Sequence, residues 1–126
     1  MSQAIMRKKI TVIEDDADLR SLIAMALKSA GFDVNIRSDG SDFLNVESRS
    51  SDLFIIDNNL GNVTGLELCR HLKQQETLAS VPVIIISAHP DIHALAAEAQ
   101  ADDTLPKPFN TRELLKKVGE YLPLEK

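Results

Sequence analysis

The chain has 126 residues, a length that suits one domain built around one core. Its 14 Lys and Arg and 19 Asp and Glu give a formal net charge of −5 at pH 7, and an acidic surface disfavours nonspecific binding to nucleic acid or anionic membranes. Hydrophobic residues make up 44% and charged residues 26%, a composition that excludes a disordered segment. We therefore expect one folded domain over residues 1–126, with neither nucleic acid nor a membrane as a direct partner.

The N-terminus and the cysteine content bear on the cellular compartment. Residues 1–5 lack the long apolar region of a secretion signal, and no apolar run approaches the ~20 residues that cross a bilayer. The single cysteine, Cys69, has no second cysteine with which to form an internal disulfide. These features predict a cytoplasmic protein. The chain also has no Trp, one Tyr and four Phe, so its core should be aliphatic.

The first half of the chain predicts two strand-then-helix units. An apolar run that is rich in β-branched residues and lacks polar alternation is typical of a strand buried on both faces. Apolar residues at three- and four-residue spacing are typical of a helix with one buried face. These criteria give a strand at 10–13, a helix over 19–30 that stops at Gly31, a short strand at Val34 and Ile36, and a weaker helix over Phe43, Leu44 and Val46.

The second half of the chain predicts three further units of the same kind. The strands are two buried runs at 53–56 and 83–86 and a short segment at Thr104 and Leu105. The helices that follow them cover residues 66–72, an Ala-rich stretch at 91–100, and residues 110–122. Asn110 and Glu113 occupy the two positions of a capping box, which marks the start of the last helix. Five such units predict a doubly wound α/β sandwich.

Polar residues follow the predicted strands at the point where each strand ends. Glu14 and Asp15 follow the first strand, Asp57 follows the third, Ser87 follows the fourth, and the fifth runs into Lys107. Because ligands of an open parallel sheet bind beyond the carboxyl ends of its strands, we expect these side chains to converge on one crevice. Clustered carboxylates repel one another and lose hydration, so such a cluster usually serves a cation. An all-oxygen set of Asp15, Asp57 and a backbone carbonyl suits Mg²⁺.

The same crevice offers groups that suit a phosphoryl group. Lys107 supplies a positive charge and Ser87 a hydroxyl donor for phosphoryl oxygens. A carboxylate such as that of Asp57 can form an aspartyl phosphate while a metal ion neutralises the entering charge, so we predict a site that accepts a phosphoryl group. The alternative is that the strand-end acids only cap helices. Capping would not require Ser87 and Lys107 at matching strand ends, but it is the preferred interpretation of Asp16 and Asp18.

At these positions the sequence resembles the receiver domain of two-component response regulators, over about residues 9–122 with short tails on either side. The resemblance is carried by residues 10–16, by Asp57 with Gly65, by Ser87 with Ala88, and by residues 107–109, in this order at the predicted strand ends. It implies a flavodoxin-like, three-layer (βα)5 sandwich with strand order 2-1-3-4-5. It also implies a phosphorylation switch that dephosphorylates itself slowly, rather than an enzyme.

The resemblance further implies a role for each site residue. Asp57 would be the phosphoacceptor, and its donor would be the phosphohistidine of a histidine kinase or phosphotransfer protein. The changed surface would bind a downstream effector protein or domain, or form a homodimer through the fourth helix, fifth strand and fifth helix. The peptide bond Lys107-Pro108 would be cis. Ser87 and Lys107 would contact the phosphoryl group, and Mg²⁺ would be held by Glu14 through water, by Asp15 and Asp57, and by the backbone carbonyl of Asn59.

Several positions depart from the usual pattern of that family. Thr104 stands where an aromatic residue usually swings inward, so we expect phosphorylation to shift the same face without a rotating ring. Gly61 replaces a common proline, Gln100 replaces a common glycine, and Pro106 requires the fifth strand to lie at the sheet edge. These departures leave open a receiver-like interaction module that acts without regulated phosphorylation. A hydrolase with an aspartyl intermediate is the least favoured alternative, because Asn59 stands where such an enzyme needs a second acid.

The other polar candidates have plainer interpretations. His71 and His93 are expected on exposed helix faces, without the partner residues that a transition-metal site needs. Cys69 is expected to be a small packing residue. The basic residues Arg112, Lys116 and Lys117 are expected on a solvated helix face.

Overall fold

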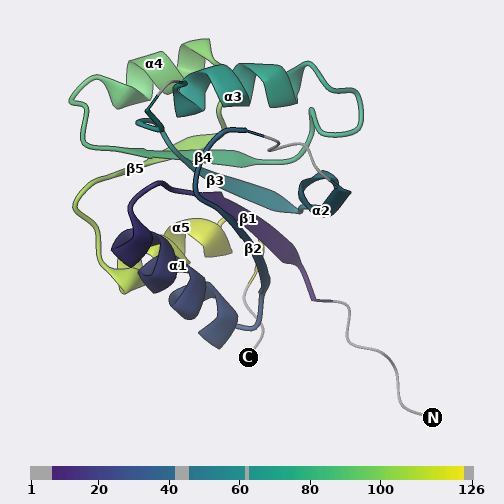
Figure 1. Cartoon of the computed structure of the whole chain (residues 1–126), viewed down its shortest axis with the longest axis vertical. Coiled ribbons are helices and arrows are strands. Elements are labelled where there is room, and N and C mark those ends of the chain that lie inside the picture. Colours follow the sequence, from purple (N-terminus) through teal and green to yellow (C-terminus); the bar gives the residue numbers. More distant parts are fainter. Residues whose placement is uncertain (1–6, 42–45, 62, 124–126) are drawn as a thin grey trace.

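A sheet of five parallel strands forms the centre of the computed structural model, which describes residues 7–41, 46–61 and 63–123 (Figure 1). The strands lie in the order β2-β1-β3-β4-β5, and every neighbouring pair is parallel. This confirms the strand order that the resemblance implies. The bounds are β1 Lys9–Ile13, β2 Asp33–Arg37, β3 Leu53–Asp57, β4 Val83–Ser87 and β5 Asp103–Pro106.

Helices cover both faces of this sheet. The helices α1 (Ala17–Ser29) and α5 (Thr111–Gly119) lie on one face, and α3 (Gly65–Lys73) and α4 (Ile92–Glu98) lie on the other (Figure 1). The four-residue helix α2 (Val46–Arg49) lies between β2 and β3 in the chain. The arrangement confirms the predicted doubly wound, three-layer sandwich. Within the described ranges, no helix has the length and apolar character needed to cross a membrane.

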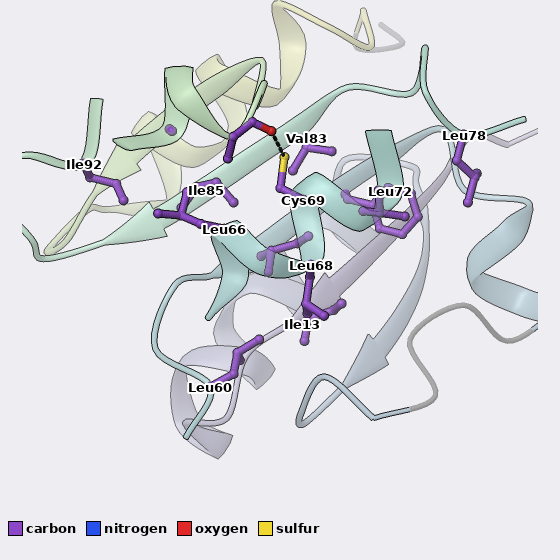
Figure 2. Close-up of a cluster of buried hydrophobic side chains, with 14 residues drawn as sticks. Ile13, Leu60, Leu66, Leu68, Cys69, Leu72, Leu78, Val83, Ile85 and Ile92 are labelled. Carbon is purple, nitrogen blue, oxygen red and sulfur yellow. Dashed lines mark hydrogen bonds between the residues drawn. The ribbon is translucent and has the colours of Figure 1, made fainter. Parts of the chain in front are cut away.

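The central strands divide their side chains between two hydrophobic clusters. All residues of β3 and β4 are buried, as the two apolar runs predict. Successive side chains of a strand point to opposite faces, so Ile85 packs with α3 and α4 while Ile84 packs with α1 and α5. In the α3–α4 cluster (Figure 2), Cys69 is a fully buried packing residue, as expected, and its Sγ lies 3.4 Å from the carbonyl oxygen of Ala99.

The predicted capping box is present at the start of α5. The Asn110 side chain accepts a hydrogen bond from Glu113 N at 2.8 Å, and Glu113 Oε1 accepts one from Asn110 N at 3.0 Å. The helix ends at Gly119, so the prediction that it continues to residue 122 is wrong. Gly is a weak helix former, and Leu122 is buried just beyond the helix end. Burial of Leu122 in the core therefore produced the helical pattern past the true end.

Two other helices have bounds that differ from the predicted ones. The Ala-rich helix α4 begins at Ile92, with Asp91 as its N-cap, and ends at Glu98. The predicted second helix corresponds to α2, which contains Val46; its other predicted positions, Phe43 and Leu44, lie outside the described residues.

Four buried polar residues form a network that joins β1, β2, α2 and the segment between α2 and β3. Asn35 Nδ2 donates hydrogen bonds to Thr11 Oγ1 at 3.1 Å and to Ser48 Oγ at 3.2 Å, and the hydroxyls of Thr11 and Ser51 share a hydrogen bond. All four side chains are buried. This network could not be predicted from the sequence, because Thr11 lies within an apolar run, where its hydroxyl gives no signal of its partners.

Candidate functional site

The carboxyl ends of the strands bring the predicted site residues to one edge of the sheet. Glu14 directly follows β1, and Asp57 is the last residue of β3. Ser87, the last residue of β4, pairs with Pro106 of β5, and the next residue, Lys107, donates a backbone hydrogen bond to the Ser87 carbonyl at 2.9 Å. Pro106 is tolerated because β5 is an edge strand, as predicted. The fold therefore gathers these residues at one end of the sheet.

Three acids form a cluster at this edge. Ligand oxygens of Glu14, Asp15 and Asp57 all lie within 4.8 Å of one another. Glu14 is fully buried and Asp57 is 3% exposed, whereas Asp15 is exposed. Within the described ranges, Glu14 Oε1 has no contact with hydrogen-bond geometry and instead forms an ion pair with the ammonium of Lys107, at 3.2 Å. An all-oxygen set that includes two buried carboxylates fits a hard divalent cation such as Mg²⁺.

Lys107 places a positive charge beside these acids. Its Nζ lies 3.0 Å from Asp57 Oδ1 and 3.2 Å from Glu14 Oε1. Burial by itself lowers the pKa of Lys107, but the hydrogen bond with Asp57 and the charges of Asp57 and Glu14 outweigh burial and raise this pKa above its ordinary value. Lys107 therefore remains positively charged in the site.

Glu14 titrates near neutrality. Burial raises the pKa of Glu14 to about 7, and the charge of Asp57 acts in the same direction. A hydrogen bond from Asp16 N, at 3.2 Å, and the charge of Lys107 partly oppose this rise. A bound cation would favour the charged carboxylate, so metal binding and loss of this proton are linked.

Several hydrogen bonds fix the loop after β1, and only some of them could be predicted from the sequence. Asp16 Oδ1 accepts hydrogen bonds from Asp18 N at 2.9 Å and Leu19 N at 3.1 Å, which confirms Asp16 as the cap of α1. Arg20 Nη1 donates to the carbonyl of Glu14 at 2.9 Å. Arg20 was not predicted as a site residue, because only the fold shows that this side chain turns back to the end of β1.

The loop after β3 returns close to the Asp57 backbone. Gly65 N, at the start of α3, donates to the carbonyl of Asn58 at 2.9 Å. A Cβ atom at position 65 would collide with the backbone carbonyl of Asp57. The position therefore requires glycine, which accounts physically for Gly65 in the sequence pattern.

Asn59 lies within the same loop. It is exposed and forms an isolated bridge with Thr64, which closes the loop on itself. Gly61 has a φ of 87°, a value that the ring of proline cannot adopt. The glycine found in place of the common proline therefore has a backbone conformation that proline could not take.

Ser87 and an apolar hollow complete the site. Ser87 is 7% exposed, and its Oγ accepts a hydrogen bond from His89 N at 3.0 Å. The peptide bond Lys107-Pro108 is cis, as the resemblance implies. A hollow of about 390 Å³ opens beside the lysine and is lined by Leu19, Ala88, Lys107, Pro108 and Phe109. The sequence did not predict this hollow, because its walls come from α1 and from the segments that follow β4 and β5.

Two side chains that are expected on solvated helix faces, those of His93 and Lys117, form polar contacts with β5. His93 is exposed, but its Nδ1 lies 2.6 Å from the hydroxyl of the buried Thr104. Lys117 is instead paired with Asp103, with Nζ 3.0 Å from Oδ1. Gln100 has a φ of 66°, in the left-handed region where its position commonly holds glycine.

Comparison with known proteins agrees with this geometry. The model of the response regulator receiver domain matches residues 10–119. Response regulator ArlR of Staphylococcus saprophyticus is 37% identical over 117 residues, which cover 90% of this chain and 52% of ArlR. DNA-binding response regulator MtrA of Mycobacterium tuberculosis is 34% identical over 120 residues, which cover 93% of this chain and 51% of MtrA. The structure of chemotaxis response regulator CheY4 of Vibrio cholerae has a TM-score of 0.85 and 25% identity, covering 93% of this chain and 100% of CheY4.

The chain spans about half the length of the two relatives found by sequence. Because MtrA is named as DNA-binding, these relatives do not support the expectation that nucleic acid is excluded as a direct partner. The match nevertheless covers most of the chain and includes every residue of the acid cluster, Ser87 and Lys107. The chain belongs to the response regulator receiver domain family, the signalling switches of two-component systems.

Proposed function

We propose that Asp57 accepts a phosphoryl group in a Mg²⁺-dependent reaction, and that the phosphorylated chain presents a changed protein-binding surface. The observation that carries this proposal is the environment of one carboxylate. Asp57 is 3% exposed, lies 3.0 Å from Lys107 Nζ, and shares a cluster with Glu14 and Asp15. A carboxylate between a fixed cation and an acidic cation site is equipped to act as a nucleophile toward phosphorus.

The proposed transfer exchanges one bond at phosphorus for another. A carboxylate oxygen of Asp57 attacks phosphorus, a P–O bond forms, and the P–N bond to the donor histidine breaks. The electron pair of that bond returns to the imidazole, which takes up a proton. Lys107 then exchanges part of its pairing with Asp57 for the new phosphoryl oxygens, and the hydroxyl of Ser87 donates a hydrogen bond to another of them.

The acid cluster would hold Mg²⁺ through Glu14, Asp15 and Asp57, together with the backbone carbonyl of Asn59. When bound, the ion neutralises the charge that the phosphoryl group brings. The all-oxygen donor set and the burial of Glu14 and Asp57 support this assignment. Within this scheme the chain dephosphorylates itself slowly and acts as a switch.

The proposed donor is a phosphohistidine on a histidine kinase or phosphotransfer protein, and the proposed receiver of the signal is a downstream effector protein or domain in the cytoplasm. Membership of the receiver family and the relatives named as response regulators support both partners.

The test is intact-mass spectrometry after incubation with acetyl phosphate, with Mg²⁺ and with EDTA. We expect one phosphoryl adduct that requires Mg²⁺ and is lost in Asp57→Ala. Asp39→Ala is the matched control, because Asp39 is an exposed acid outside the cluster, and it should keep the adduct. An adduct that persists in Asp57→Ala would contradict the assignment of the acceptor.

A second candidate function rests on Thr104, which occupies the position of the usual aromatic residue. A receiver-like interaction module that binds partners without regulated phosphorylation would give no adduct in the same experiment. Partner binding that is equal for the wild-type chain and Asp57→Ala would then favour this module.

A further inference from the structure

His93 and Thr104 form a polar contact between α4 and the edge strand β5. His93 Nδ1 lies 2.6 Å from Thr104 Oγ1. Thr104 is 3% exposed, whereas His93 lies at the surface. Among the residues that the structure describes, the His93 ring is the only hydrogen-bond partner of the Thr104 hydroxyl. A buried hydroxyl without a partner is costly, so this bond holds His93 against β5.

Thr104 lies on the same face of the sheet as Ser87. In the β4–β5 register, Thr104 pairs with Ile85 and Pro106 pairs with Ser87. Side chains two residues apart on a strand share a face, and Ile85 packs in the α3–α4 cluster (Figure 2). The side chains of Ser87 and Thr104 are therefore diagonal neighbours on the α4 side of the sheet.

A series of hydrogen bonds also joins Ser87 to the start of α4. Ser87 Oγ accepts from His89 N at 3.0 Å, and His89 Nδ1 accepts from Asp91 N at 3.0 Å. Asp91 is the N-cap of α4, and His93 lies in its first turn. A displacement of the Ser87 hydroxyl therefore acts on the loop and on the helix that carries His93.

We propose that the hydrogen bond between His93 and Thr104 couples the Ser87 site to the surface of α4, β5 and α5, in place of a rotating aromatic ring. The inference rests on the proposed phosphorylation of Asp57. The coupling requires two arrangements of the chain. In the first the bond is formed, and in the second α4 has moved with Ser87 and the bond is broken. His93 and Thr104 line a hollow of about 380 Å³ together with Glu113, Lys116 and Lys117 of α5, so the change alters the shape and charge of that surface.

The bond belongs to the arrangement in which Lys107 is paired with Asp57 and Glu14. A phosphoryl group has to displace this pairing. A contact that stabilises the paired arrangement therefore weakens phosphoryl binding, and binding weakens the contact in return. Removal of the Thr104 hydroxyl should increase the affinity for a phosphoryl mimic by roughly 2–10-fold, the effect of one net hydrogen bond.

The test is a titration of the full chain with beryllium fluoride and Mg²⁺, followed by NMR of backbone amides and histidine rings. Thr104→Val keeps the branched shape and removes the hydroxyl, and Thr104→Ser is the matched control that keeps it. We expect the wild-type chain and Thr104→Ser to show shifts of the His93 ring and the α4 amides on binding. Thr104→Val should bind the mimic more tightly, with its His93 ring already shifted before the mimic is added. His93→Ala breaks the same bond from the helix side and should give the same gain in affinity.

Equal affinities and equal α4 shifts in Thr104→Val and the wild-type chain would overturn the coupling while leaving the phosphoacceptor site intact. Shifts confined to the surroundings of Asp57, with an unmoved His93 ring, would overturn it as well. If the wild-type chain failed to bind the mimic at all, the proposed function would fall, and the coupling with it.

Discussion

Lys107 Nζ lies 3.0 Å from Asp57 Oδ1, so the lysine neutralises a carboxylate that is almost fully buried. The buried Glu14 Oε1 lies 3.2 Å from the same nitrogen. One cation thus serves two carboxylates, and the cluster is net negative when both are ionised. Without a metal ion this arrangement lowers stability, because like charges repel and their hydration is lost.

Two substitutions in this cluster should therefore change stability in opposite directions. In Mg²⁺-free buffer at about pH 8, Asp57→Asn should raise the free energy of unfolding by about 1–2 kcal/mol, because it removes one negative charge. Lys107→Ala should lower it by about 1–3 kcal/mol, because it leaves the carboxylates without their cation. Urea unfolding followed by circular dichroism measures both changes.

Glu76→Gln is the control for this pair, because Glu76 is an exposed acid outside the cluster, and its effect should stay within about 0.5 kcal/mol. Equal losses of stability in Asp57→Asn and Lys107→Ala would show that the cluster is not strained by excess negative charge.

The affinity for Mg²⁺ should rise as the pH rises through about 7, where burial places the pKa of Glu14. A proton on Glu14 competes with the cation, so raising the pH removes the competitor. Affinity should increase by up to about tenfold per pH unit below this pKa and level off above it. Glu14→Gln should bind more weakly and lack the pH dependence, whereas Glu76→Gln should keep it. Titration calorimetry would measure this, and a flat wild-type profile would rule Glu14 out of the metal site.

Relief of backbone strain at Gln100 should stabilise the fold. With a φ of 66°, Gln100 holds a left-handed conformation that costs about 1 kcal/mol for a residue with a Cβ atom. Gln100→Gly should therefore raise the free energy of unfolding by about 1 kcal/mol. Gln74 is the matched control at the end of α3, with a φ of −87°. Gln74→Gly should lower stability by about 0.5–1 kcal/mol, and a loss in both variants would contradict strain at position 100.

The buried polar network should contribute measurably to stability. Asn35→Ala removes the donor to Thr11 and Ser48 and should lower the free energy of unfolding by about 1–3 kcal/mol, because buried oxygens lose their partner. Ser21→Ala, at an exposed position of α1, should have an effect within about 0.5 kcal/mol. A similarly small effect of Asn35→Ala in thermal or urea unfolding would show that water replaces the lost bonds.

The positions of the main site residues could be predicted because the sequence marks strand ends clearly. The apolar runs stop at Glu14, Asp57 and Ser87, and in a parallel sheet such ends share one edge. The start of α5 was equally clear, since the capping box is a local pattern of Asn110 and Glu113. Local signals of this kind survive folding because tertiary contacts do not compete with them.

The features that the sequence did not predict depend on contacts between distant segments. His93 gave the signal of an exposed helix residue, and only the packing of α4 on β5 brings its ring to Thr104. The return of Arg20 to the carbonyl of Glu14 likewise follows from the path of the loop. The residue type of Gln100 does not indicate its strained backbone, because glutamine rarely adopts such a φ; only the glycine common at this position in the family pointed to it.

The chemical location of the phosphoryl group is the most direct test of Asp57 as the acceptor. After incubation with acetyl phosphate and Mg²⁺, borohydride reduction converts an aspartyl phosphate to homoserine, and peptide mass mapping locates the changed residue. Phosphorylation of the buried carboxylate beside Lys107 predicts homoserine at position 57 and at no other acid, with none formed in EDTA. Homoserine at another acid, or its absence at position 57 in a chain that carries the phosphoryl adduct, would contradict the assignment of Asp57 as the acceptor.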